Sequence, residues 1–285
     1  MSDAENPQAE ESKTPGPGGE LFMRVVTAVV LGVGAVATAW AGGLVFLIVW
    51  TVAAAIVWWE WVGIVKAEQR PVLIGIGIAA VVGMAISLEA DAAAIAFVCA
   101  VVGAGIAMSC VRTARHWTGG GVLYAATLLI PAVMLRSDPA WGFIAIIWLF
   151  AVVWAEDTGA YFTGRIFGGP KLAVSISPSK TWSGAAGGTV AGILAGNIVI
   201  LVAGIPWRPA HLALAFAVAV AAQLGDLLES AIKRRFAVKD ASNLVPGHGG
   251  LMDRLDGFLI AAALALAIGF VNGGVRSPAS GLLQW

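Results

Sequence analysis

Long apolar stretches, separated by short charged or Pro/Gly-rich segments, make up most of the chain. An apolar stretch of about 18 residues or more can cross the hydrocarbon core of a bilayer as a helix. The pattern predicts an all-α fold, a polytopic integral-membrane bundle of about nine transmembrane helices. The expected spans are residues 22–40, 43–65, 71–88, 91–111, 119–135, 141–158, 184–206, 211–234 and 256–273.

Composition supports a membrane protein. The 285 residues are 59% hydrophobic and 12% charged, whereas soluble domains have about 25% charged residues. The formal net charge is zero, so no basic surplus suggests a nucleic-acid partner. Cys99 and Cys110 lie in one apolar segment, which disfavours a disulfide framework or a zinc site.

Three regions are expected along the chain. Residues 1–20 are acidic and rich in Pro and Gly, which predicts a disordered tail and is unlike the basic start of a secretory signal. Residues 21–140 are predicted to form the N-terminal transmembrane helices. Residues 141–285 are predicted to form a catalytic transmembrane region with two cytoplasmic loops.

The basic residues predict the orientation in the cell membrane. If the N-terminus is cytoplasmic, only Arg136, Arg208 and Arg276 of the 17 Lys and Arg residues fall on the opposite side. Such a bias is typical of cytoplasmic loops. We therefore expect a multi-pass membrane protein with a cytoplasmic N-terminus.

Acidic residues inside the spans point to a site. A carboxylate at the bilayer centre costs roughly 2.5–3.5 kcal/mol, so each one needs a reason. Six such residues fall in the cytoplasmic half, across several helices, which indicates a pocket open to the cytoplasm. They are Glu60, Glu156, Asp157, Asp226, Glu229 and Asp256.

The eighth expected helix and the segment after it concentrate these charges. Asp226, Ser230 and Lys233 share one face of that helix. The following loop mixes carboxylates with cations, which suits a divalent ion bridging a polyphosphate, and its adjacent glycines allow backbone N–H groups to approach phosphate oxygens. Its polar and glycine positions include Lys239, Asp240, His248, Gly249, Gly250, Asp253, Arg254 and Asp256.

A second cytoplasmic segment, between the sixth and seventh spans, has a similar mixture of acid, base and hydroxyl groups. Gly168, Gly169 and Pro170 break the helix there and predict a turn. The polar residues are Asp157, Arg165, Lys171, Ser177, Ser179, Lys180 and Thr181. Four glycines at every fourth position, Gly184, Gly188, Gly192 and Gly196, predict close packing of the seventh helix on another helix; shaping a lipid groove is the alternative.

These residues resemble the signature of the phosphatidate cytidylyltransferases, also called CDP-diacylglycerol synthases. The matching positions between 230 and 256 are Ser230, Lys233, Arg234, Lys239, Asp240, Ser242, Pro246, His248, Gly249, Gly250, Asp253, Arg254 and Asp256. Upstream matches are Asp157, Thr158, Ala160, Tyr161, Gly164, Arg165, Ser177, Pro178, Lys180, Thr181, Trp182 and Gly184. Ser183 stands where members commonly carry Glu.

The resemblance implies a Mg²⁺-dependent reaction in phospholipid biosynthesis in which CTP and phosphatidate give CDP-diacylglycerol and pyrophosphate. It implies catalytic roles for Asp226, Lys233, Asp253 and His248. Substrate binding is assigned to Lys180, Ser177, Arg234, Lys239, Gly249, Gly250, Arg254 and Asp157. Metal binding is assigned to Asp226, Asp253 and Asp256, with a second, monovalent cation left open. For His248, general acid and structural hydrogen-bonding roles both remain open.

The expected partners are CTP, phosphatidate and the lipid bilayer, without nucleic acid, and a homodimer is left open. Two other functions compete. A CTP-dependent polyprenol or lipid kinase would transfer the terminal phosphoryl group instead. An ion-coupled transporter would place its charges near the bilayer midplane and would use paired broken helices, neither of which the sequence indicates.

Overall fold

The computed structural model of the chain describes residues 17–245 and 249–284. The predicted tail therefore lies outside the described residues as far as residue 16, and α1 begins at Pro17. The helices are α1 (Pro17–Ala41), α2 (Gly43–Val65), α3 (Arg70–Glu89), α4 (Ala93–Ser109), α5 (Arg115–Arg136), α6 (Gly142–Phe167), α7 (Trp182–Val202), α8 (Ala210–Arg235), α9 (Met252–Gly273) and α10 (Pro278–Leu283), and the strands are β1 (Lys171–Ala173) and β2 (Ser177–Thr181).

The long helices confirm the prediction of an all-α membrane bundle. Each of the nine expected spans corresponds to one of α1 to α9 in the described part of the chain. Seven of them, α2, α3 and α5 to α9, are long and apolar enough to cross a membrane; α1 and α4 contribute the shorter apolar stretches Val25–Ala41 and Ala93–Ser109. The chain is therefore a multi-pass membrane protein.

The connection between α6 and α7 differs from the expected loop. Helix α6 continues to Phe167, beyond the expected end at 158, and its cap is Gly168 with φ +60°, a conformation that glycine adopts without steric cost. An antiparallel hairpin follows, in which Lys171 pairs with Thr181. The Thr181 hydroxyl then accepts a hydrogen bond from the N–H of Gly184, which caps the start of α7.

The glycine stripe of α7 packs on α6, as predicted. The four glycines are all buried. A Cβ atom at Gly188 would lie 2.7 Å from the backbone oxygen of Glu156, and one at Gly192 would lie 3.1 Å from that of Val152. Only glycine allows this approach. The opposite side of α7 exposes large apolar side chains, including Leu194 at 60%, which suits contact with acyl chains.

The interior of the bundle is centred on α5, where 83% of the most apolar stretch is buried. Beside it, aromatic rings from three helices meet. Phe258 of α9 lies 5.0 Å from Trp50 of α2 and 5.5 Å from Phe150 of α6 between ring centroids. This contact joins the N-terminal and C-terminal halves of the chain.

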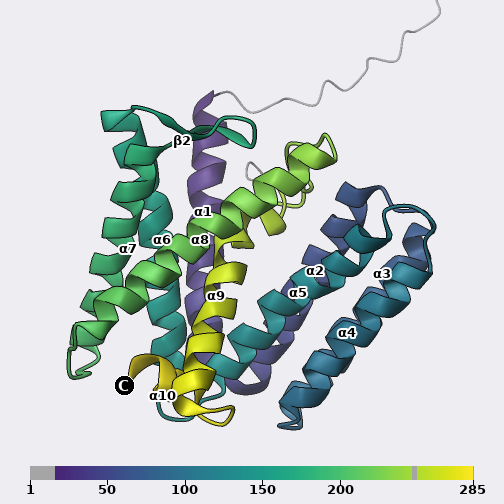
Figure 1. Ribbon diagram of the computed structural model, residues 1–285, viewed down its shortest axis with the longest axis horizontal. Coiled ribbons are helices and arrows are strands. Elements are labelled where there is room, and N and C mark those ends of the chain that lie inside the picture. Colours follow the sequence, from purple (N-terminus) through teal and green to yellow (C-terminus); the bar gives the residue numbers. More distant parts are fainter. Residues whose placement is uncertain (1–16, 246–248, 285) are drawn as a thin grey trace, which may run out of the picture.

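One end of the bundle collects the segments that carry the predicted site. Figure 1 shows the β hairpin, the α8–α9 connection and the beginning of α1 at the same end, with the C-terminus at the other. The site residues therefore lie together at one end of the bundle, although they come from distant parts of the sequence.

Candidate active site

Helices α8 and α9 approach each other closely where the site forms. Gly225 of α8 faces the backbone of Asp256, and a Cβ atom at Gly257 of α9 would lie 3.2 Å from the carbonyl oxygen of Ala222. Because glycine has no side chain, the two backbones can approach each other closely at these positions. As a result, Asp226 and Asp256, the neighbours of these glycines, lie on adjacent helices at the crossing.

A cavity of about 500 Å³ opens between α6, α7, α8 and the β hairpin. This volume falls in the range of about 300–1,000 Å³ that small-molecule pockets occupy. Three predicted site residues line it: Asp157 from α6, Lys180 from β2 and Asp226 from α8. The remaining lining residues are Glu156, Ala160, Tyr161, Gly164, Arg165, Leu172, Ser179, Thr181, Gly184, Ala185 and Gln223.

Lys180 and Asp226 form an ion pair across this cavity. Their side chains are 25% and 28% exposed, so both groups can reach solvent. The hydroxyl of Ser230, one turn along α8, lies 3.4 Å from the carboxylate of Asp226. The pair joins the hairpin to α8 and places an ammonium and a carboxylate side by side at the cavity wall.

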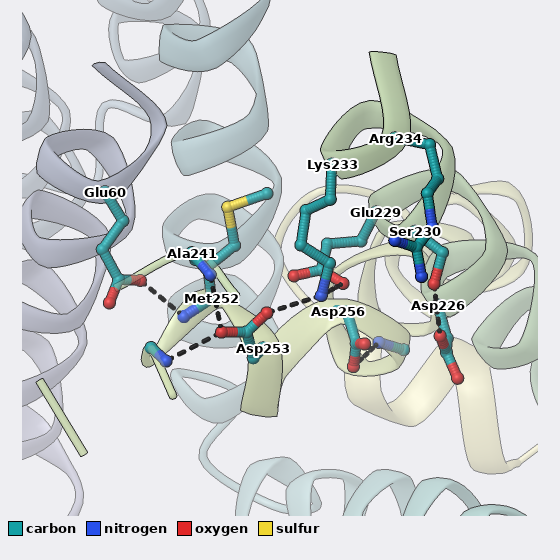
Figure 2. A network of polar contacts seen from close by, with 12 residues as sticks. Glu60, Asp226, Glu229, Ser230, Lys233, Arg234, Ala241, Met252, Asp253 and Asp256 are labelled. Carbon is teal, nitrogen blue, oxygen red and sulfur yellow. Dashed lines mark hydrogen bonds and ion pairs between the residues drawn. The ribbon is translucent and has the colours of Figure 1, made fainter. Parts of the chain in front are cut away.

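A second, more enclosed network lies beside the first (Figure 2). The ammonium of Lys233 is 2.6 Å from Asp253 and 2.6 Å from Glu229, which is buried. The other oxygen of Asp253 accepts hydrogen bonds from the backbone N–H groups of Ala241, at 2.9 Å, and Gly250, at 2.7 Å. Asp253 thus fastens the α8–α9 connection, residues 236–251, which we call the signature loop, to the start of α9.

The carboxylates of the two networks are close enough to interact. Figure 2 shows Asp256 in the view between Asp253 and Asp226. Asp256 lies within electrostatic range of Asp226, Asp157 and Lys233. Arg254, whose side chain is exposed, lies within electrostatic range of Asp157. The site is therefore an acidic centre with basic side chains around it.

The other predicted residues are more dispersed. Ser177 begins β2 and pairs with Ala173, without lining the cavity in the described structure. Arg234 donates from Nε to the carbonyl of Ile176 at 3.3 Å, so it contacts the hairpin turn. Lys239 is exposed. The substrate-binding roles of these three side chains stay predictions.

Part of the signature loop falls outside the described residues, including His248. Beside it, the carbonyl of Gly249 accepts a hydrogen bond from Val245 at 2.8 Å. The N–H of Gly250 donates to Asp253, so contact between this N–H and phosphate would require that bond to break. Ser183 donates from its hydroxyl to the carbonyl of Gly168, which ties the end of α6 to the start of α7.

Three polar residues around the site have contacts that the sequence did not predict; Glu60 and Glu156 were only placed among the acidic residues of the pocket, and Gln223 was not singled out. Glu156 is buried beside Asp157. Gln223 donates from its amide to the hydroxyl of Thr189 at 2.9 Å, which links α8 to α7. Glu60 of α2 bonds to the start of α9. The signal for each was a polar group in an otherwise apolar helix.

The donor set suits a hard divalent cation only in part. No group of three His, Cys, Asp or Glu side chains placed to hold a metal ion occurs within residues 17–245 and 249–284. Mg²⁺, however, is often held by one or two carboxylates together with substrate phosphates and water. Asp226, with Asp157 and Asp256 nearby, fits that description, because its oxygens contact two partly exposed side chains, those of Lys180 and Ser230. Asp253 is more enclosed, and its oxygens are bonded to Lys233 and to the backbone N–H groups of Ala241 and Gly250.

Comparison with known proteins identifies the family. A model of the cytidylyltransferase family matches residues 22–271. The chain is 38% identical over 254 residues to a Brucella suis protein named phosphatidate cytidylyltransferase, covering 88% of this chain and 94% of the relative. Proteins of the same name are 44% identical over 128 residues in Bacillus subtilis, covering 45% and 48%, and 46% identical over 123 residues in Mycobacterium bovis, covering 41% and 40%. The chain therefore belongs to the cytidylyltransferase family and is an enzyme of the nucleotidyltransferase class.

Proposed function

We propose that this protein is a phosphatidate cytidylyltransferase, which converts CTP and phosphatidate to CDP-diacylglycerol and pyrophosphate. The observation that carries the proposal is the Lys180–Asp226 pair at the wall of a cavity in a membrane bundle of this family. Relatives named phosphatidate cytidylyltransferase support the choice of substrates.

The chemistry needs charge neutralisation more than proton transfer. An oxygen of the phosphatidate phosphate attacks the α-phosphorus of CTP, and the bond from that phosphorus to the bridging oxygen of the β-phosphate breaks. Pyrophosphate leaves with the electron pair. Because the attacking oxygen is already anionic, no serine–histidine pair is required; positioning and electrostatic stabilisation supply the catalysis.

The chain supplies cations for this purpose around the acidic centre. Lys180 reaches the cavity from the hairpin, and Arg254 lies near Asp157. We assign these two, together with Lys239 and Arg234, to the phosphates of CTP and phosphatidate. Lys233 is held between Glu229 and Asp253, so we expect it to keep the acidic centre in place and to add positive charge there.

We propose that Mg²⁺ is the cofactor and that Asp226 is its main protein ligand, with Asp256 and Asp157 in support. When bound, the ion would neutralise charge on the phosphate oxygens. Asp253 stays a predicted ligand, although its bonds to the signature loop favour an anchoring role.

The site is proposed to face the cytoplasm, with the N-terminus on the same side. Support comes from the distribution of Lys and Arg along the sequence and from the gathering of the hairpin, the α8–α9 connection and the start of α1 at one end (Figure 1). CTP would then enter from the cytoplasm and phosphatidate from the bilayer. A homodimer stays a prediction.

Product analysis tests the function. Purified protein in detergent is incubated with CTP, phosphatidate and Mg²⁺, and the lipids are separated by chromatography and identified by mass. CDP-diacylglycerol formed in proportion to pyrophosphate is the expected result. CDP with a newly phosphorylated lipid would indicate the kinase instead, and ion uptake by proteoliposomes without any lipid product would indicate a transporter.

A further inference from the structure

Glu60 is the one ionisable residue in α2, and its carboxylate is buried, with 1% of the residue exposed. Every hydrogen bond that the structure gives it comes from the segment around the signature loop. Oε1 accepts from the N–H of Leu251 at 2.9 Å and from the hydroxyl of Ser242 at 2.6 Å. Oε2 accepts from the N–H of Met252 at 2.7 Å.

These bonds cap α9 from another helix. The first N–H groups of a helix have no partner within it and carry partial positive charge, so a carboxylate there is stabilising. Leu251, the residue in the capping position, provides no side-chain hydrogen bond of its own. Glu60 supplies the missing acceptor from the N-terminal half of the chain (Figure 2).

Gly250 shows how tightly this contact is built. A Cβ atom at that position would lie 2.5 Å from Oε1 of Glu60 and 2.9 Å from Cβ of Ala241. Its N–H donates to Asp253. The N–H groups of three consecutive residues, 250 to 252, are thus held by two carboxylates, one from α2 and one from α9.

The same loop carries the charges proposed to hold CTP. Asp253 follows the capped residues directly and pairs with Lys233, while Lys239 and Asp240 come just before Ala241, whose N–H is also bonded to Asp253. A shift of the start of α9 would move all of these groups together. Burial of Glu60 for stability alone would not require that its partners come from the signature loop.

We propose that Glu60 is a positioning residue for cytidylyl transfer: it fixes the signature loop and the first turn of α9 so that the acidic centre and the CTP phosphates meet. The proposal rests on the proposed function. It assigns to the N-terminal half of the chain a direct part in the geometry of the site, through a residue that touches no substrate.

Glu60→Gln tests it, because the amide keeps the shape but one of its two polar atoms cannot accept a hydrogen bond. Either Met252 or the pair Leu251 and Ser242 then faces an amide NH₂ group. The loss of one hydrogen bond to a charged acceptor changes an equilibrium or rate constant by about 10- to 100-fold. We expect kcat/KM for CTP to fall by that factor with a raised KM for CTP, and KM for phosphatidate to stay within about twofold.

Glu68→Gln is the matched control. Glu68 is exposed in the connection between α2 and α3 and accepts a hydrogen bond from Thr113, so the same change of charge should leave both KM values unaltered. Hydrogen–deuterium exchange provides a second readout. Faster exchange confined to the peptide covering residues 241–252 in Glu60→Gln is expected, whereas a purely structural role would raise exchange through the whole bundle.

Unchanged kinetic constants for CTP in folded Glu60→Gln protein would overturn the proposal, as would a fall in kcat that merely follows the folded fraction. If Glu60→Gln is not recovered folded, Ser242→Ala takes its place with the same criteria. This change removes one of the three bonds to Glu60, together with the bond that the hydroxyl accepts from the N–H of Leu244, and a smaller rise in KM for CTP is expected. Failure of the wild-type protein to make any CDP-lipid would instead refute the proposed function, so the two failures are distinguishable.

Discussion

Two of the aspartates assigned to the metal, Asp226 and Asp253, should respond differently to replacement by asparagine. Asp253 is buried and accepts three hydrogen bonds. In Asp253→Asn, the NH₂ group must face either the ammonium of Lys233 or two backbone N–H groups. Removing one partner of a buried ion pair costs about 3–5 kcal/mol. Lys233 keeps its ion pair with Glu229 in this variant. We therefore expect the free energy of unfolding to fall by about 3 kcal/mol, the lower end of that range.

Asp226→Asn should lower the stability of the protein much less than Asp253→Asn does. Asp226 and its partner Lys180 are both about a quarter exposed, at 28% and 25%, and ion pairs near the surface contribute about 0–1 kcal/mol. We therefore expect nearly wild-type stability. Turnover should nevertheless fall by about 100- to 1,000-fold, the usual cost of removing one group that stabilises charge in the transition state.

Both variants are compared with wild type by thermal unfolding in one detergent and by CDP-lipid formation per folded molecule. Equal unfolding temperatures for wild type and Asp253→Asn would refute the anchoring role of Asp253. Wild-type turnover in folded Asp226→Asn would refute its place in the site.

Three further predictions concern packing, pH and the cofactor. Gly188→Ala should destabilise the protein by about 1–3 kcal/mol through overpacking against Glu156, while Gly105→Ala, where a Cβ meets nothing within 4 Å, should not; thermal unfolding of both variants checks this. Burial acts to raise the pKa of Asp138, but hydrogen bonds from Ser280, Trp141 and Ala140 outweigh it and hold that pKa below its usual value. The carboxylate therefore stabilises the protein above the unfolded-state pKa, near 3.9, and this contribution is lost as pH falls through the lowered pKa. Asp138→Asn should unfold at a lower temperature than wild type at pH 7, with the difference shrinking below about pH 4; a constant difference would contradict the assignment. Chelation of divalent ions should abolish CDP-lipid formation and added Mg²⁺ should restore it; turnover that persists after exhaustive chelation would exclude the proposed cofactor.

The helices could be predicted because span length in a membrane depends on local composition. The residues at which the helices end were harder to predict. Helix α6 continues beyond its charged residues to Phe167 and ends at Gly168, where the backbone turns left-handed. The hairpin of β1 and β2 was missed because the segment SPSKT lacks the β-branched and aromatic alternation that predicts a strand; pairing within the α6–α7 connection determines its structure.

The residue types of the site could also be predicted, because charges in a membrane segment need a purpose. Their pairings could not. Asp226 and Asp253 were assigned one role from the sequence, whereas the structure pairs them with different lysines, Lys180 and Lys233. The contact of Glu60 with the start of α9 depends on how distant helices pack, which no local pattern encodes.

The fate of the phosphates of CTP tests cytidylyl transfer most directly. Purified protein receives phosphatidate, Mg²⁺ and CTP labelled either at the α- or at the γ-phosphate, and the label is measured in the lipid and aqueous fractions. Cytidylyl transfer predicts α-label in the lipid and γ-label in pyrophosphate. Recovery of γ-label in the lipid would contradict it.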